Sequence, residues 1–481
     1  MDNAMKRTLF TLAALVAASL ALDAKVTLPH AISDGMVIQQ ECEANLWGWA
    51  DKGRTVRVTV SWSKGKYSAK AGEDGKFILK VKTPSASFTP QTITFDDGGG
   101  KVTVTDVLVG DIWFCGGQSN MGMPMAGYDD CPVEGYNEAV ADAVNSGGVR
   151  FLKVQPKTSM TPLEDVPCEW KACSPSTIRY CDAIPYYFGR LLYHTLDIPV
   201  GLVEANMGGT CVEGWIDEDN LRKYTDEDLS EDAINSIKPE GMRPLVWGNG
   251  TYWPVRHHTA RGIIWYQAES NIWHATQDYP RRLAILVDQW RKGYGRSAEE
   301  VPFYYVEITP FSYDDPDGTR SAHMREIQFK AMDVVPNSSM VCTNDCMYDW
   351  EVNQIHPSQK RKIGERLAYL ALNKTYGLKD IICESPRFRE MKVSGDTVRV
   401  YLDNEFGGLY RSEGLVGFEV AGEDKVFHPA EARRIFKECI EITCPDVPKP
   451  VAVRYCFKNF QLGNVANLAG LPLYPFRTDD W

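Results

Sequence analysis

The region spanning residues 25–106 shows an alternation of hydrophobic and polar residues. Runs with this pattern are separated by turn signals such as Glu73-Asp74-Gly75-Lys76. No segment here has the spacing of a long amphipathic helix. Because alternation directs one set of side chains to a core and the other to solvent, it predicts an N-terminal β-sandwich-like domain. The supporting runs are Thr55–Trp62, Phe77–Val81 and Lys101–Val107.

Between residues 107 and 382 the pattern changes to continuous apolar runs that alternate with helical segments. Strands buried on both faces lose the alternation, so we predict an α/β domain with a parallel sheet covered on both faces. Asp217–Trp253 lacks periodicity and is expected to be a long insertion near the site. The apolar runs are Val107–Cys115, Ile198–Glu204, Arg261–Tyr266, Pro302–Ile308 and Ser339–Thr343, and the helical segments are Ile184–Leu196, Tyr279–Lys292, Thr319–Met332 and Pro357–Lys374.

Strand patterns return in residues 383–481 and predict a C-terminal β module. A chain of 481 residues is expected to contain two or three domains, and 44% hydrophobic with 24% charged residues is typical of globular proteins. The runs of this last region are Thr397–Tyr401, Val416–Val420, Ile440–Ile442 and Val451–Tyr455.

The first 24 residues have the features of a secretory signal peptide. Lys6 and Arg7 precede the apolar stretch Thr8–Leu22, which is short for a membrane span, and Ala21 or Ala24 offers a cleavage point. The alternative is an uncleaved N-terminal anchor. No other apolar run has the length of a membrane span. We therefore expect an exported protein, periplasmic or secreted, with no membrane span in the mature chain.

Charge and aromatic content narrow the classes of partner. The chain has 52 Lys and Arg against 64 Asp and Glu, a net charge of −12, which argues against nucleic acid. Its 13 Trp, 22 Tyr and 18 Phe suit surfaces that stack on sugars. They suit an aromatic core equally well, so composition leaves both interpretations open.

A serine follows a glycine pair where the first apolar run of the α/β region ends. The segment is Trp113-Phe114-Cys115-Gly116-Gly117-Gln118-Ser119-Asn120-Met121. Glycines permit a tight turn that lifts a hydroxyl clear of the sheet, and the N–H groups of a following helix can face an oxyanion. Taken alone, Ser119 could equally lie in an ordinary strand-to-helix turn.

Polar and small residues also follow the later runs, and ligand sites of open α/β sheets lie beyond the carboxyl ends of the strands. Gly208 and Gly209 follow the second run, where a backbone N–H can approach a bound carbonyl. Gln267 and Asn271 follow the third, and either amide can donate to an oxyanion. For Glu269, which lies between them, we predict a structural hydrogen bond to a backbone turn.

A histidine precedes the last predicted helix of the region, in Ile355-His356-Pro357. A histidine in this position suits a general base for a serine, and it suits a helix cap or a packing residue as well. The other histidines form no pair on a helix face, and the cysteines form no zinc pattern. We therefore predict no metal site and no cofactor.

Serine, glycine, amide and histidine at four successive strand ends form a set more specific than any single member. The set resembles the sialate O-acetylesterase group of SGNH-type (GDSL-like) esterases. The resemblance covers nearly the whole mature chain and includes Ser33–Gln39, Trp113–Met121, Gly208–Thr210, Ile263–Asn271, Ile355–Pro357, Lys362–Ala368, Gly470–Pro472 and Pro475–Asp479. It implies an SGNH-hydrolase three-layer α/β/α domain over residues 107–382, flanked by β-sandwich-like modules at 25–106 and 383–481.

The resemblance further implies hydrolysis of an acetyl ester on a sugar. Ser119 is then the nucleophile and His356 its base, and water releases acetate from the acyl-enzyme. The groups implied for the oxyanion hole are the N–H of Ser119, the N–H of Gly208 or Gly209, and the side chain of Gln267 or Asn271.

Two features depart from the family's pattern. Ala268 stands where the third block usually has glycine, a small change if its backbone angle is ordinary. Gln354 and Asn353 stand where the family or related hydrolases place the Asp that precedes the histidine, and neither carries the charge that stabilises an imidazolium. One hypothesis is a Ser–His dyad whose ring is oriented by an amide oxygen or a backbone carbonyl near Asn353. Another uses a carboxylate of the same loop, namely Asp345, Asp349 or Glu351.

Three functions compete at this point: an esterase for O-acetylated sialic acid, an esterase for acetylated xylan or another plant glycan, and a carbohydrate-binding protein without activity. A sialate carries a carboxylate, so its site should offer an Arg or a cluster of donors, and Arg256 and Arg320 are candidates. A neutral xylan needs neither. The complete set from Ser119 to His356 favours an enzyme, and the sequence leaves the oligomeric state open.

Overall fold

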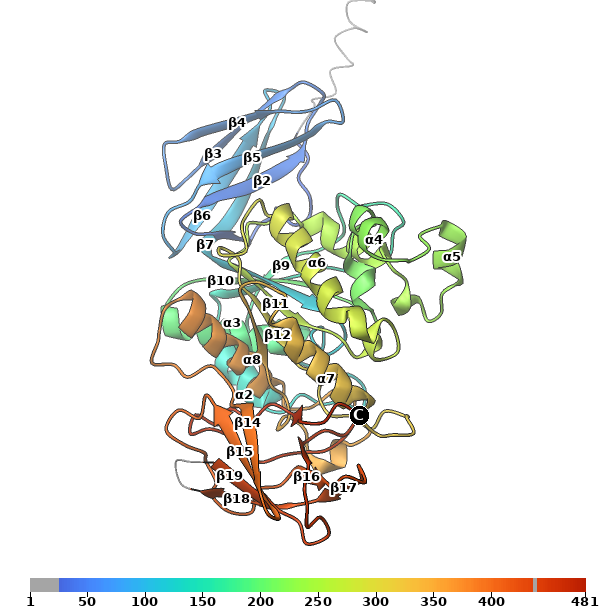
Figure 1. Ribbon diagram of the computed structural model, residues 1–481. Coiled ribbons are helices and arrows are strands. Elements are labelled where there is room, and N and C mark those ends of the chain that lie inside the picture. Colours follow the sequence, from blue (N-terminus) through green and yellow to red (C-terminus); the bar gives the residue numbers. More distant parts are fainter. Residues whose placement is uncertain (1–25, 436–438) are drawn as a thin grey trace, which may run out of the picture.

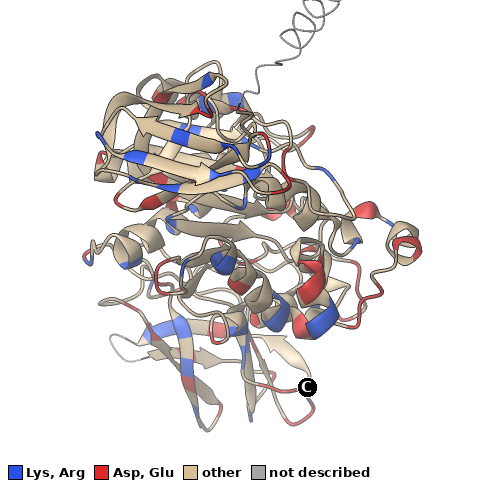
Figure 2. Ribbon diagram, turned by 90° about the horizontal axis from the view of Figure 1, so that it is seen from above, with Lys and Arg blue, Asp and Glu red and all other residues tan. Residues whose placement is uncertain are grey.

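The computed structural model describes residues 26–435 and 439–481 and arranges them as three stacked modules (Figure 1). An N-terminal β module and a C-terminal β module lie at opposite ends of a central α/β module. Basic and acidic residues are interspersed over all three (Figure 2). The signal peptide predicted for residues 1–24 lies outside the described residues. Within them, no helix combines the length and apolarity needed to cross a bilayer.

The N-terminal module consists of the strands β1 (Val37–Gln39), β2 (Glu43–Trp49), β3 (Thr55–Val60), β4 (Lys66–Lys70), β5 (Lys76–Lys82), β6 (Ser87–Asp96) and the first part of β7 (Lys101–Gly117). β2 pairs with β5, while β3 lies between β4 and β6, and β6 pairs with β7. In β3, Val56, Val58 and Val60 are buried and the residues between them are exposed. The alternation therefore gives the predicted β module, in which one face of the strand lies in the core.

Strand β7 belongs to both the first and the second module. Its first part pairs antiparallel with β6, and its second part lies in the parallel sheet of the α/β module. The predicted boundary between residues 106 and 107 thus falls inside a strand. From Val107 onward every side chain of β7 is buried, so the change of pattern marks the point where the strand becomes covered on both faces. At this junction Arg150 forms an ion pair of 3.0 Å with Asp106.

The α/β module adds the strands β8 (Val149–Lys153), β9 (Trp170–Ala172), β10 (Val200–Asn206), β11 (Gly262–Tyr266), β12 (Phe303–Val306) and β13 (Ser338–Val341). Its helices are α2 (Tyr136–Asp142), α3 (Ala183–Leu196), α4 (Glu218–Tyr224), α5 (Glu231–Ser236), α6 (Tyr279–Gly293), α7 (Arg320–Ala331) and α8 (Lys360–Leu370). The strand order is β13-β12-β11-β7-β10-β8-β9, and only the edge pair β8–β9 is antiparallel.

Helices cover both faces of this sheet. Trp113 and Cys115 of β7 pack into the core that contains α3 and α8, whereas Ile112 and Phe114 pack into the core that contains α6 and α7. Successive side chains of a strand point to opposite faces, so an apolar run without alternation is required here. The predicted three-layer α/β/α architecture is confirmed.

The insertion predicted at Asp217–Trp253 contains α4 and α5 and packs against the loop that follows β10. Leu221, Ile234 and Leu245 of the insertion are buried in the core beneath it. A Cβ on Gly241 would lie 2.4 Å from the Gly209 carbonyl oxygen, so this approach requires glycine. The insertion therefore holds the loop after β10 in place.

The C-terminal module contains β14 (Arg387–Ser394), β15 (Thr397–Asp403), β16 (Phe418–Ala421), β17 (Phe427–Pro429), β18 (Glu431–Ile435), β19 (Cys439–Thr443), β20 (Ala452–Tyr455) and β21 (Phe476–Arg477). They form two antiparallel sheets, β14-β15-β19-β18 and β17-β16-β20-β21. Val398, Val400 and Ile440 pack in the core between them. The predicted C-terminal β module is confirmed, and Arg325 of α7 ties it to the central module by donating to the Lys458 carbonyl at 2.6 Å.

Candidate active site

Ser119 and His356 lie in contact at the carboxyl end of the central sheet. Ser119 follows β7, His356 precedes α8, and the distance from Ser119 Oγ to His356 Nε2 is 2.8 Å. Both residues are half-buried, so solvent reaches the pair. The turn between β7 and Ser119 requires Gly117, which has a φ of +145°, and a Cβ there would lie 2.1 Å from the Tyr266 carbonyl oxygen. The two residues predicted to react together are thus within hydrogen-bond distance.

Gly208 lies beside Ser119, whereas a side chain on Gly209 would be in open space. A Cβ on Gly208 would lie 3.2 Å from the Ser119 Cβ, while a Cβ on Gly209 would meet no atom within 4 Å. Within the described residues, neither the Ser119 N–H nor the Gly208 N–H has a hydrogen-bond acceptor in the chain. The Gly209 N–H also lacks an acceptor among the described residues, so the N–H groups of Ser119, Gly208 and Gly209 are all available to an oxyanion beside the hydroxyl.

The side-chain amides of Gln267 and Asn271 are already hydrogen-bonded and do not suit the oxyanion role predicted for them. Gln267 Nε2 donates to the Thr210 carbonyl at 2.9 Å and to Asn271 Oδ1 at 2.8 Å. Asn271 Nδ2 donates to Glu213 at 3.1 Å and to the His274 carbonyl at 3.1 Å. Both residues are fully buried, where each N–H must find an acceptor. The oxyanion role predicted for these amides is therefore wrong, and they instead hold the segment that follows Gly208 in place.

A buried polar network lies beneath Ser119. Asn120 Nδ2 donates to Glu269 at 2.6 Å and to the Ile355 carbonyl at 3.0 Å, and the Lys360 ammonium donates to Asn120 Oδ1 at 2.5 Å. Burial raises the pKa of Glu269 and lowers the pKa of Lys360 to about 7. Glu269 therefore has a structural role as predicted, with the Asn120 side chain as its partner in addition to the backbone turn.

Sequence reasoning missed Asn120 and Lys360, although a signal for Lys360 was present. Lys360, Ile363 and Leu367 share the spacing of one helix face, and all three are buried in α8. A lysine on an apolar helix face requires a polar partner inside the protein. Here that partner is Asn120, which connects the turn of the nucleophile to the peptide before His356.

No carboxylate orients the ring of His356 within the described residues. Gln354 Oε1 accepts from the His356 backbone N–H at 3.2 Å, and Asn353 is exposed without a hydrogen bond to the ring, so neither has the orienting role predicted for it. Glu351 accepts from the backbone of Tyr348 and Ser358. The remaining carboxylates of the loop also miss the ring: Asp345 pairs with Arg366, and Asp349 makes no hydrogen bond to it.

The Nδ1 atom of His356 faces a thiol instead of an acid. Cys131 Sγ lies 4.0 Å from Nδ1, and the ring of Tyr128 packs edge-on against the imidazole with centroids 5.2 Å apart. Burial, with a smaller contribution from the Lys360 charge, lowers the pKa of His356 to about 4. The imidazole is therefore neutral, and able to accept a proton, over a wide pH range.

A cavity of about 190 Å³ opens in front of Ser119. Gly208, Tyr128, Lys153 and Asp182 line it, and the Lys153 ammonium forms a short ion pair with Asp182. Burial and the neighbouring Asp182 charge raise the pKa of Glu204 at the back of the cavity. The space beside the nucleophile thus suits a small acyl group with a polar attachment.

The two arginines considered for a substrate carboxylate lie elsewhere. Arg256 pairs with Glu164 at 3.0 Å and lies over the Trp253 ring, and Arg320 lies 4.1 Å from the centroid of Trp273. Neither lines the cavity in front of Ser119. Within the described residues, no group of three or more His, Cys, Asp or Glu is arranged to hold a metal ion.

Ala268 has an unusual backbone conformation. Its φ is +146°, a region that favours glycine, and the residue is fully buried. The expectation of a small steric change rested on an ordinary backbone angle, and the structure corrects it. The alanine methyl group is therefore held in a strained conformation next to Gln267.

Comparisons with known proteins converge on one group of enzymes. Residues 109–373 match the family model described as "Carbohydrate esterase, sialic acid-specific acetylesterase". The chain is 29% identical over 387 residues to the sialate O-acetylesterase of Homo sapiens, covering 74% of this chain and 72% of the relative. It is 26% identical over 411 residues to that of Mus musculus, covering 74% of each. The crystal structure of a carbohydrate acetylesterase from Xanthomonas citri superposes with a TM-score of 0.83 at 29% identity, covering 95% of this chain and 100% of that one.

Proposed function

The chain belongs to the sialic acid-specific acetylesterase family of carbohydrate esterases, and from this premise we propose that Ser119 and His356 remove O-acetyl groups from sialic acid. The family resemblance predicted from the sequence is confirmed, and the protein is a carbohydrate O-acetylesterase. The alternative of a binding protein without activity is set aside for that reason. The observation that carries the proposed mechanism is the 2.8 Å contact between Ser119 Oγ and His356 Nε2.

The proposed reaction begins when Ser119 Oγ attacks the acetyl carbonyl carbon while its proton passes to His356 Nε2. The N–H groups of Ser119 and Gly208 stabilise the negative oxygen of the tetrahedral intermediate. The bond to the sugar oxygen then breaks, and His356 gives that oxygen its proton. Water attacks the acetyl-serine with His356 again as the base, and acetate leaves while Ser119 regains its proton.

We infer that the reaction uses a Ser–His dyad. Because no Asp or Glu of the described residues hydrogen-bonds to His356, the imidazolium is stabilised mainly by the adjacent oxyanion. The peptide before His356 is held by Asn120, which fixes the position of the ring from the backbone side. The dyad needs this support, since a base without an orienting acid loses rate when its ring can rotate.

Acetate release tests the proposal. Wild-type protein is incubated with O-acetylated sialic acid and, separately, with acetylated xylooligosaccharide, beside Ser119→Ala and the matched control Ser176→Ala, an exposed serine of the same module. We expect the sialate to be preferred, Ser176→Ala to match the wild type, and Ser119→Ala to lose activity by a factor of at least about 10³. A preference for the xylooligosaccharide would keep the chemistry and contradict the substrate, and an active Ser119→Ala would contradict the mechanism.

Export is part of the proposal. It is supported by the basic residues Lys6 and Arg7 and the apolar stretch Thr8–Leu22, followed by small residues. N-terminal sequencing of the protein recovered from outside the cytoplasm tests it. A mature chain that begins near residue 22 or 25 is expected, and retention of residues 1–24 would favour the uncleaved anchor.

A further inference from the structure

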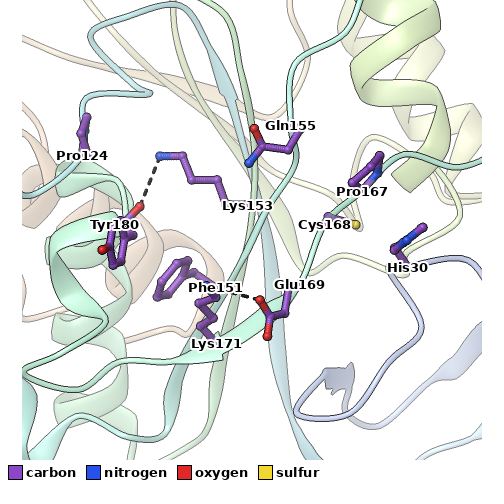
Figure 3. Close-up of a pocket in the computed structure, with 10 residues that line it drawn as sticks. All are labelled: His30, Pro124, Phe151, Lys153, Gln155, Pro167, Cys168, Glu169, Lys171 and Tyr180. Atoms are coloured by element: carbon purple, nitrogen blue, oxygen red, sulfur yellow. Dashed lines mark hydrogen bonds and ion pairs between the residues drawn. The ribbon is translucent and has the colours of Figure 1, made fainter.

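A second, larger hollow shares a lining residue with the cavity of Ser119, and Figure 3 shows the side chains that line it. It has a volume of about 550 Å³ and extends from His30 of the N-terminal module to Tyr180 of the central module. Lys153 lines both this groove and the cavity of about 190 Å³ in front of Ser119, so the two spaces are neighbours. We call the larger space the Lys153 groove.

Size distinguishes the roles of the two spaces. Pockets that hold small-molecule ligands typically measure roughly 300–1,000 Å³. The cavity of about 190 Å³ is below that range and accommodates the reacting acyl group, whereas the groove of about 550 Å³ is within it. The bulk of a substrate whose acyl group reaches Ser119 therefore has to lie in a space such as the groove.

The edge pair β8–β9 gives the groove one polar and one apolar component. Phe151 of β8 lies directly opposite Lys171 of β9, and Lys153 is two residues along from Phe151, so all three share one face of the sheet. Phe151 is buried and forms an apolar floor, while Tyr180 at the rim has 54% of its surface exposed. An aromatic rim above hydrogen-bonding side chains suits a sugar, which has apolar ring faces and polar edges.

The charged residues that line the groove are Lys153, Lys171 and Glu169, and the two lysines differ in how firmly they are paired. The Lys153 ammonium pairs with the buried Asp182. Among the described residues, the Lys171 ammonium pairs only with Glu169, at 3.3 Å, and the Glu169 side chain, which also lines the groove, is 74% exposed. A pair between exposed groups is weak and exchanges readily for another carboxylate. The Arg179 guanidinium lies 5.5 Å from the Tyr180 ring centroid, and the Lys171 ammonium lies 5.9 Å from the same centroid.

We propose that the Lys153 groove is the subsite for the body of an anionic sugar, with the Lys171 ammonium binding the sugar carboxylate and the Tyr180 ring packing against the sugar. The inference rests on the proposed function and deepens it, because it assigns the cation that recognises a sialate. The acetyl group of the same molecule reaches Ser119 past Lys153. Lys171 takes the role that sequence reasoning had considered for Arg256 and Arg320.

Kinetics with a charged and a neutralised form of one substrate test the inference. The charged form is O-acetylated sialic acid, and the neutral form is its carboxylate methyl ester. The measured quantity is the ratio of kcat/KM for the charged form to kcat/KM for the methyl ester. The variants are Lys171→Ala, Lys171→Arg and the control Lys292→Ala, an exposed lysine of α6 that also pairs with a carboxylate, Asp288 at 2.6 Å.

The wild-type ratio is expected to be about 10 or more, since one charge-assisted contact at a half-exposed site is worth about a tenfold preference. Lys171→Ala should bring the ratio to about 1, Lys171→Arg should retain most of it, and Lys292→Ala should leave it unchanged. Tyr180→Ala should raise KM for both forms several-fold without changing the ratio.

The possible failures are distinguishable. If acetate is released from both sialates with the same kcat/KM, or if Lys171→Ala leaves the ratio intact, the inference is overturned while the proposed function stands. If the wild type releases acetate from acetylated xylooligosaccharide and from neither sialate, the proposed function fails and the inference fails with it.

Discussion

The low pKa of His356 leads to a quantitative prediction about the pH dependence of catalysis. The ring is partly buried, lies near the Lys360 ammonium and lacks a carboxylate partner, and its pKa is lowered from 6.5 to about 4. Only the neutral imidazole can accept the proton of Ser119. At pH 5 a histidine of pKa about 4 is about 90% neutral, whereas one of pKa about 6.5 is about 3% neutral. Activity at pH 5 should therefore remain within about 10% of its plateau.

The assay is kcat/KM for 4-nitrophenyl acetate between pH 3.5 and 8, with circular dichroism as a check that the protein stays folded. This substrate has no group that titrates in the range, so the acid limb of the profile reports the free enzyme. The limb should be centred near pH 4. As the pH falls the Lys360 ammonium remains charged, so removal of that charge in Lys360→Met should move the limb to higher pH.

A limb centred near pH 6.5 in the wild type would refute the reasoning, because it would mean that a negative group or solvent stabilises the imidazolium in solution. An unchanged limb in Lys360→Met would refute the narrower claim that the lysine charge contributes. Either result can be separated from loss of fold, since the circular dichroism spectrum and the plateau activity at pH 7 report folding independently.

Two further predictions concern residues beneath the reacting pair. Ala268→Gly should raise the free energy of unfolding by about 1 kcal/mol, because glycine adopts the φ of +146° without the strain that alanine carries; thermal unfolding measures this, and a lowered melting temperature would contradict it. Asn120→Ala should cost about 3 kcal/mol of stability, since it leaves Lys360 and Glu269 buried without their partner. Denaturant unfolding measures that cost, and Asn145→Ala, at the exposed end of the short 3-10 helix Ala143–Asn145, provides the control.

The residues that could be predicted from the sequence are those whose role depends on position along a strand or helix. Ser119 follows a strongly patterned strand and His356 precedes a strongly patterned helix. The carboxyl ends of parallel strands lie at one edge of the sheet, where these residues are expected to meet. The continuous apolar run of β7 likewise predicted that both faces of the strand are buried. In each case the pattern along one segment determines where its residues lie in the fold.

Other features depend on contacts between distant segments, which local patterns do not encode. Gln267 and Asn271 lie at a strand end, as an oxyanion donor would. Their amide N–H groups instead donate hydrogen bonds to Thr210 and Glu213, which belong to another loop. The φ of +146° at Ala268 has no signal in the sequence, because alanine normally adopts a negative φ. The continuity of β7 across two modules also escaped prediction, because pairing partners, rather than composition, determine where a strand ends.

Strand β7 joins the first two modules through one continuous strand. The same run of peptide bonds that begins in the antiparallel ladder with β6 ends at the glycine turn that presents Ser119. At the junction Asp106 has a φ of +53°, which interrupts the extended backbone between the two ladders, and His30 of the N-terminal module lines the Lys153 groove. The N-terminal module therefore contributes to the lining of the proposed substrate site and is continuous, through β7, with the turn that presents Ser119, so it is part of that site and not an appended domain.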